Sequence, residues 1–233
     1  MTDACFHFQN KLKWKQALFF MEKKYRKKAF IALGIIFLII VVDQILKIWI
    51  KTNMMMGEEY RIADWFIIHF TENPGMAFGM EFGGDYGKLA LSLFRLVAIA
   101  FMTWYLFRSI TKKANYYFIV PLSLIVAGAL GNLIDSAFYG LIFNESYHQV
   151  AQMFPPDGGY AGFLHGRVVD MFYFPIINGT YPDWVPRIGG NPFTFFKPVF
   201  NIADASITTG VFILIIFYKR AFPDSDKAKK KEA

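Results

Sequence analysis

The chain has 233 residues, of which 55% are hydrophobic and 19% are aromatic. An apolar content this high excludes a disordered chain, and the single cysteine, Cys5, excludes a disulfide scaffold. The net charge of +7 comes largely from three basic clusters that each adjoin a long apolar block. This arrangement favours the positive-inside pattern of a membrane protein over a nucleic-acid-binding surface, so we expect no nucleic acid partner.

Four apolar blocks are long enough to cross a bilayer, which takes about 20 residues in a helix. They are residues 29–50, 87–107, 116–138 and 204–222. We therefore predict a mainly α membrane protein with four transmembrane helices, a small extracytoplasmic sheet and a loop insert.

The charge clusters predict the topology. Basic residues crowd the N-terminal segment 1–28, the link between the second and third blocks, and the tail 223–233. The positive-inside rule places all three on the cytoplasmic side. Residues 29–222 then form a single membrane domain, whose long connections 51–86 and 139–203 face outward.

The first block has a second interpretation, because a basic segment before an apolar run is also typical of a cleaved signal peptide. Its apolar run is too long for that, and no small-residue cleavage site follows it. We interpret it as a retained helix, with Met1 or Met21 as the start of the chain.

The outer connections carry strand and turn patterns. Residues 65–70 form a short aromatic, apolar run that ends in the turn set 72–75, which predicts a small sheet at the membrane surface. Residues 181–197 mix prolines with aromatics, and we expect them to lie at the bilayer interface.

Polar residues inside the apolar blocks require an explanation, because an ionisable side chain costs about 2.5–3.5 kcal/mol at the centre of a spanning helix. Asp43 and Lys47 lie four residues apart and can form an ion pair on one helix face. They form either a structural salt bridge or the floor of a polar pocket. Asn132 and Asp135 share a face in the third block, where small neighbours allow another helix to approach closely.

Two further carboxylates lie at the outer edge of the predicted bilayer. Asp170 stands in an apolar, strand-like stretch, and Asp204 opens the last apolar block. Asp204 has a structural alternative as a helix N-cap. If the two side chains meet, one keeps a proton while the other is ionised, and such a pair suits acid–base hydrolysis.

Other chemistries lack support in the sequence. The four histidines form no metal-binding array, and neither a nucleophile-elbow motif nor a phosphate-binding loop is present. We therefore expect no metal and no organic cofactor.

Five motifs occur in a fixed order along the chain: Asp43-Gln44-x-x-Lys47, Asn73-Pro74-Gly75-Met76-Ala77-Phe78, Gly131-Asn132-x-x-Asp135, Val168-Val169-Asp170 and Phe200-Asn201-x-Ala203-Asp204. As an ordered set they resemble the lipoprotein signal peptidase family, also called signal peptidase II. That family comprises bacterial inner-membrane aspartic endopeptidases with four spans, a small outer β-cradle and a periplasmic helix.

The resemblance implies a role for each matching position. It makes Asp170 and Asp204 the catalytic pair. It assigns three asparagines to the substrate pocket: Asn73, Asn132 and Asn201. It assigns supporting polar roles to Asp43, Lys47 and Asp135.

The resemblance also implies the reaction and its setting. The family removes the signal peptide from prolipoproteins, just before a cysteine that carries diacylglycerol, and it is inhibited by the cyclic peptide globomycin. By this resemblance we expect prolipoprotein and membrane-lipid partners, a monomer, an inner-membrane location and an active site near the periplasmic face.

The chain departs from the family pattern in two places. Ser136 stands where the family usually has Arg, and we expect Arg167, three residues before Asp170, to supply the missing cation. The link from Asp135 to Asp170 is longer than usual, and we interpret its insert, residues 142–165, as a mobile flap over the site or a contact for a partner.

Two other classes of function compete with this interpretation. A small proton-coupled transporter would use Asp43, Asp135 and Asp204 as relay groups, although no internal repeat supports it. A non-catalytic membrane scaffold would tolerate replacement of every aspartate.

Overall fold

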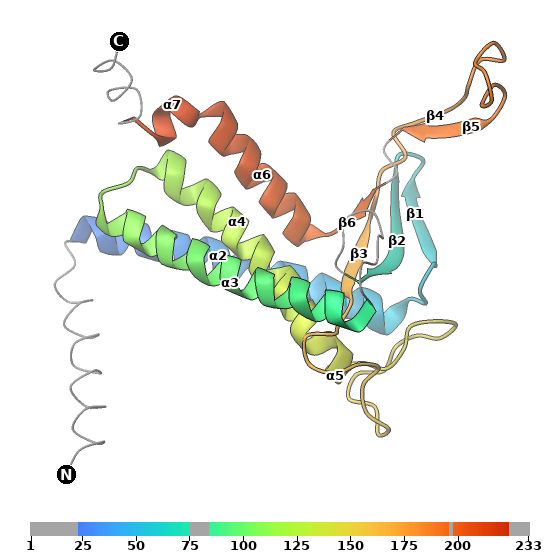
Figure 1. Ribbon diagram of the computed structural model, residues 1–233, viewed down its shortest axis with the longest axis horizontal. Coiled ribbons are helices and arrows are strands. Elements are labelled where there is room, and N and C mark those ends of the chain that lie inside the picture. Colours follow the sequence, from blue (N-terminus) through green and yellow to red (C-terminus); the bar gives the residue numbers. More distant parts are fainter. Residues whose placement is uncertain (1–22, 75–83, 196–197, 224–233) are drawn as a thin grey trace.

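The computed structural model describes residues 23–74, 84–195 and 198–223, and its helices run together towards a β-sheet at one end (Figure 1). Most of the basic N-terminal segment and of the C-terminal tail therefore lies outside the described residues. So do Gly75 to Phe78, the last four of the six residues of the motif that begins at Asn73.

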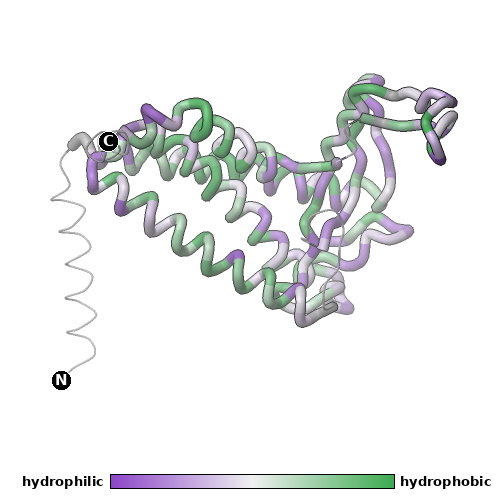
Figure 2. Tube along the Cα trace, turned by 45° about the horizontal axis from the view of Figure 1, so that its top comes forward, coloured by the Kyte–Doolittle hydropathy of each residue, from purple (hydrophilic) through white to green (hydrophobic). Residues whose placement is uncertain are grey.

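Among the described residues, three helices are long and apolar enough to cross a membrane. They are α2 (Lys23–Asn53), α3 (Gly84–Thr111) and α4 (Tyr116–Ile134), the last of which continues through a π-helical turn, η2 (Asp135–Tyr139), into α5 (Gly140–Ile142). Figure 2 shows hydrophobic residues along most of their length. Large apolar side chains such as Phe37 and Phe94 are each 70% exposed, as expected of surfaces that face lipid.

The fourth apolar block forms a shorter helix than the sequence predicts. Helix α6 (Ile202–Ile216) has 15 residues and is about 22 Å long, whereas the hydrocarbon core is about 30 Å thick. The helix ends at Phe217, and a single turn, α7 (Tyr218–Ala221), follows. Three membrane-length helices are thus found among the described residues, and the predicted fourth span is not confirmed.

Helix α4 forms the centre of the helical layer, because it packs against α2, α3 and α6. Small residues permit this close packing. A Cβ atom on Gly128 would lie 2.1 Å from the Ala203 carbonyl oxygen, and one on Gly131 would lie 2.8 Å from the Asp43 carboxylate. The predicted close approach of another helix at these small residues is confirmed.

The predicted sheet at the end of the helices is also confirmed. Its four antiparallel strands lie in the order β1-β2-β3-β6. Their bounds are β1 (Glu59–Ala63), β2 (Phe66–Asn73), β3 (Val168–Tyr173) and β6 (Val199–Phe200). In the register of β2 and β3, Thr71 lies opposite Asp170 and Asn73 lies opposite Val168.

A separate hairpin extends beyond this sheet, away from the helices (Figure 1). It pairs β4 (Ile177–Thr180) with β5 (Pro192–Phe195). Trp184 and Phe195 are 81% and 58% exposed on it. Contact of this region with the bilayer interface stays a prediction.

The insert 142–165 is bound to the helix ends along its length, unlike a free flap. The Ala151 N–H donates to the Lys51 carbonyl at 3.2 Å, and the Met56 N–H donates to the Ser146 carbonyl at 3.0 Å. Gly159 contacts the backbone of α5 so closely that a Cβ there would lie 2.0 Å from the Gly140 carbonyl oxygen. Among the described residues, no recorded contact joins the insert to Asp170 or Asp204.

The contact between α4 and α6 yields a first prediction. Replacing Gly128 with Ala should force the two helices apart, because the new methyl group meets backbone rather than a movable side chain. We expect a loss of about 1–3 kcal/mol in the free energy of unfolding, measured by thermal denaturation in detergent. Gly34→Ala is the matched control, since a Cβ there has nothing within 4 Å. Equal melting temperatures for the two variants would contradict this packing.

Candidate active site

Asp170 lies in the middle of β3 and is only 4% exposed. Its carboxylate accepts a hydrogen bond from the Asn201 side-chain amide at 2.8 Å and another from the side chain of Asn73. The strand register explains the second contact, because Asn73 is opposite Val168 and therefore lies diagonally across from Asp170 on the same face. The sheet thus brings one predicted pocket asparagine onto a predicted catalytic carboxylate.

Asp204 lies in the first turn of α6, where it completes a capping box with Asn201. Asn201 is the N-cap residue, so Asp204 has the predicted structural role of capping α6 from position N3 and not from the N-cap position itself. The Asn201 side chain accepts the Asp204 N–H at 2.9 Å, and the Asp204 carboxylate accepts the Asn201 N–H at 3.4 Å. The other Asp204 oxygen accepts the side-chain amide of Asn132 at 2.8 Å.

The asparagines join the two carboxylates into one cluster. The Asn201 amide that contacts Asp170 also reaches the Asn132 side-chain oxygen, at 3.1 Å. Burial and, to a lesser extent, the nearby negative charge of Asp204 together raise the pKa of Asp170 to about 7. The structure therefore places two carboxylates from distant parts of the chain within electrostatic reach, one of them poised to hold a proton near neutral pH.

A buried lysine on α2 contacts this cluster through Asn132 and two further aspartates. The Lys47 ammonium lies 2.8 Å from Asp43, 2.7 Å from Asp135 and 2.9 Å from the side-chain oxygen of Asn132. The side chains of the lysine and of both aspartates are fully buried. The predicted pairing of Asp43 with Lys47 is confirmed, and Asn132 and Asp135 contact the same ammonium.

Each of these aspartates also holds a backbone group beside a predicted catalytic residue. Asp43 accepts the Ala203 N–H at 2.9 Å, one residue before Asp204. Asp135 accepts the Val169 N–H at 3.3 Å, one residue before Asp170. The lysine cluster therefore links α2 and α4 to the two segments that carry the predicted catalytic pair.

Sequence reasoning assigned no site role to two side chains that belong to this cluster. The Gln44 side-chain amide donates to Asp135 at 2.8 Å, and the Tyr139 hydroxyl donates to the Gln44 side-chain oxygen at 3.1 Å. Gln44 stands within the first motif, and Tyr139 follows Asp135 by four residues. The spacing of Tyr139 from Asp135 was the only available signal for its place on the same face.

Arg167 follows Gly166, whose N–H donates to the Ser136 carbonyl at 2.9 Å. Its guanidinium pairs with Glu145 at 2.8 Å and with Glu72 at 3.1 Å, whereas the ammonium of Lys47 contacts Asp135. That Arg167 supplies the cation missing at Ser136 stays a prediction. The Ser136 hydroxyl donates to the Asn132 carbonyl at 3.0 Å, within its own helix.

The Arg167 contacts belong to a second buried network. Glu72 also pairs with the Lys51 ammonium and accepts the Ser146 hydroxyl at 2.7 Å. The Tyr160 ring lies 5.0 Å from the Lys51 ammonium and 4.8 Å from the Arg167 guanidinium. Burial alone would raise the pKa of Glu72, but the charge of Lys51 and the hydrogen bonds hold that pKa below its ordinary value. This network joins the insert to the strand that carries Asn73.

Within residues 23–74, 84–195 and 198–223, no group of three or more His, Cys, Asp or Glu side chains is arranged to hold a metal ion.

The architecture and this cluster together describe an enzyme embedded in a membrane, with a carboxylate site where the helices meet the sheet. A family model for signal peptidase (SPase) II matches residues 35–220. The chain is 53% identical over 188 residues to a lipoprotein signal peptidase of Porphyromonas gingivalis, and the aligned part makes up 80% of this chain and 82% of that relative. It is 40% identical over 200 residues to a lipoprotein signal peptidase of Amoebophilus asiaticus, covering 84% and 80% of the two chains.

The fold comparison agrees with the sequence comparisons. A solved bacterial membrane enzyme covers 87% of this chain, with 93% of its own chain matched, a TM-score of 0.52 and 25% identity. The chain belongs to the signal peptidase II family and is a peptidase of the aspartic type. Membership of a peptidase family disfavours the transporter and scaffold alternatives.

The second buried network generates a prediction about stability. Lys51→Met should leave the Glu72 carboxylate, 1% exposed, without its ammonium partner. We expect a loss of about 3 kcal/mol in the free energy of unfolding, measured by thermal denaturation in detergent. Arg61→Met is the control, because that pair with Asp64 is exposed and should contribute under about 1 kcal/mol. Similar losses in the two variants would show that the buried pair contributes no more to the free energy of unfolding than the exposed one.

Proposed function

We propose that this chain removes the signal peptide from prolipoproteins by cleaving before a cysteine that carries diacylglycerol, and that Asp170 and Asp204 perform the chemistry. The observation that carries the proposal is the pair of carboxylates held by a shared set of asparagine side chains. The family supplies the reaction class, and the geometry supports this assignment of residues.

The surroundings of the two carboxylates favour different roles for them. Asp170 is buried and has a pKa of about 7, so it retains a proton that it can donate. Asp204 accepts N–H groups from Asn201 and Asn132, and it is the partner left to take a proton from water. Asp204 is therefore the better general base and Asp170 the better general acid.

The proposed reaction follows from these roles. Asp204 takes a proton from water as the water oxygen bonds to the scissile carbonyl carbon, while Asp170 donates its proton to the carbonyl oxygen. The carbon–nitrogen bond then breaks, and the leaving amine receives the proton held by Asp204. Breakdown of the intermediate returns the hydroxyl proton to Asp170, so the pair regains its starting state.

The position of the site suits a substrate anchored by lipid. Asp170 and Asp204 lie where the sheet meets the helix ends, beside helices whose outer surfaces are strongly apolar. Within our proposal, the diacylglyceryl chains lie against these apolar surfaces while the peptide crosses the sheet edge. Asparagine side chains offer both a donor and an acceptor to an extended peptide backbone.

The proposed membrane topology has four crossings. Helix α6 and turn α7 together run from Ile202 to Ala221, and we propose that they form the fourth crossing despite the break at Phe217. Both termini then lie in the cytoplasm and the sheet faces the periplasm of a bacterial inner membrane. We also propose that residues 29–222 act as one peptidase domain, that the enzyme works as a monomer and that globomycin occupies the substrate site.

Replacement of either aspartate tests the assignment. We expect Asp170→Asn and Asp204→Asn each to lower cleavage of a diacylglyceryl-modified prolipoprotein by at least about 10³-fold, because a proton donor or acceptor is removed. The assay uses purified protein with and without globomycin, and thermal denaturation checks that each variant folds. Asp64→Asn is the control, since its side chain is 98% exposed and should leave cleavage unchanged. Full activity in either site variant would defeat the proposal.

The pH dependence tests which carboxylate holds the proton. Asp170 is the acid in the proposed scheme, so kcat/KM should fall about tenfold per pH unit above its pKa of about 7. Asn201→Ser keeps a helix-capping side chain but removes the amide that favours ionised Asp170. The midpoint of the alkaline limb should therefore move to higher pH in this variant, whatever its rate. An unmoved midpoint would assign that limb to another group.

A further inference from the structure

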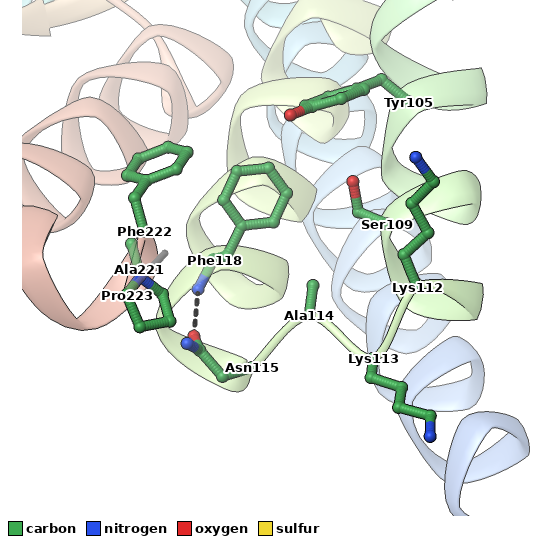
Figure 3. Close-up of a pocket in the computed structure, with 10 residues that line it drawn as sticks. All are labelled: Tyr105, Ser109, Lys112, Lys113, Ala114, Asn115, Phe118, Ala221, Phe222 and Pro223. Carbon is green, nitrogen blue, oxygen red and sulfur yellow. Dashed lines mark hydrogen bonds between the residues drawn. The ribbon is translucent and has the colours of Figure 1, made fainter. Parts of the chain in front are cut away.

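A cavity of about 470 Å³ lies at the end of the helices opposite the sheet, and no step of the proposed reaction uses it. It is formed by the end of α3, the start of α4 and the residues after α6 (Figure 3). Lys112 and Lys113 lie on one side of it, and Phe222 and Pro223 on the other. The volume is within the range of small-ligand sites, about 300–1,000 Å³.

The residues that line the cavity include two lysines and no acidic residue. No ion pair joins Lys112 or Lys113 to an acidic group among the described residues. The sequence has no acidic residue at all between 86 and 134 or between 205 and 223. Lys28, only 5% exposed, donates to the Ala114 carbonyl and adds a third ammonium to the same turn.

The backbone at this turn adds to the positive potential. Helix α4 begins here, and its N-terminal dipole favours an anion. Lys113 adopts a left-handed conformation, with φ of 71°, at the helix-end position where glycine is least strained. Its N–H donates to the Ile110 carbonyl at 3.2 Å, and the Ala114 N–H donates to the Ser109 carbonyl at 3.0 Å. Backbone geometry alone favours glycine at 113, and lysine adds an ammonium.

Apart from Ser109 and Asn115, the remaining walls of the cavity are largely apolar and lie next to the lipid-facing surface of α3. Tyr105 and Phe118 line the cavity and contact each other edge to face, with ring centroids 5.8 Å apart. Beside Tyr105 on α3, Phe101 and Trp104 are 60% and 55% exposed. A ligand that fits both parts has an anionic head and long apolar chains.

We propose that this cavity binds the headgroup of an anionic phospholipid, with the phosphate between Lys112, Lys113 and the start of α4, and the acyl chains along α3. Charge complementarity selects this occupant, because a basic pocket between helix ends attracts anionic headgroups of the adjoining leaflet. The proposal concerns the end of the molecule remote from Asp170 and does not depend on the proposed function.

Native mass spectrometry of the full-length chain in detergent, titrated with phosphatidylglycerol or phosphatidylcholine, tests the site. The double variant Lys112→Gln with Lys113→Asn removes both charges, and asparagine tolerates the left-handed conformation at 113. The matched control is Arg26→Gln with Lys27→Gln, which removes two exposed charges from the start of α2. Melting temperatures and prolipoprotein cleavage, measured in parallel, check that each variant is folded.

We expect wild type and control to prefer phosphatidylglycerol, and the pocket variant to bind it about 30-fold more weakly, from about fivefold per lysine. Equal losses in the control and pocket variants would indicate general surface attraction and overturn the proposal. Equal binding of the two lipids by wild type would overturn it too. A preference for phosphatidylglycerol that appears only after deletion of residues 224–233, which contain Asp224 and Asp226, would assign the cavity to the chain's own tail.

Discussion

The Lys47 ammonium is the interaction on which the rest of the site depends. It lies in a fully buried position, where an unpaired charge would be prohibitive, and it is compensated by Asp43, Asp135 and the Asn132 side chain. Since each aspartate also accepts a backbone N–H, from Ala203 at Asp43 and from Val169 at Asp135, the ion pairs fix the start of α6 and the middle of β3 together. The separation of Asp170 from Asp204 is therefore set by a charge cluster within the helices.

The close packing around that cluster follows from the same constraint. A side chain larger than glycine at 131 would meet the Asp43 carboxylate, and one at 128 would meet the start of α6. Asn201 then serves two purposes with one side chain, since its oxygen caps α6 and its amide holds Asp170. Capping and positioning are thus inseparable at this residue, and α6 cannot shift without disturbing the carboxylate pair.

Local patterns predicted the parts of the molecule that depend on local physics. Hydropathy located α2, α3 and α4, helical spacing predicted the pair of Asp43 and Lys47, and the aromatic run predicted β2. Hydropathy could not show that α6 ends at Phe217, because the apolar run continues through Phe217 and no charged residue occurs before Lys219. The partners of Arg167 lie 22 and 95 positions away along the chain, and their contact depends on tertiary packing that spacing does not reveal.

Strand geometry explains why the Arg167 side chain pairs with Glu72 and Glu145 and does not contact Asp170. Side chains alternate between the two faces of a strand, so residues three apart point in opposite directions. In the observed register, Asn73 lies diagonally across from Asp170 on one face, while Glu72 lies diagonally across from Arg167 on the other. A slip of one residue would exchange the faces and place the Glu72 network on the side of the carboxylate pair. The salt bridges of the opposite face, anchored to α2 through Lys51 and to the insert through Glu145, therefore specify the register that keeps Asp170 beside Asn201.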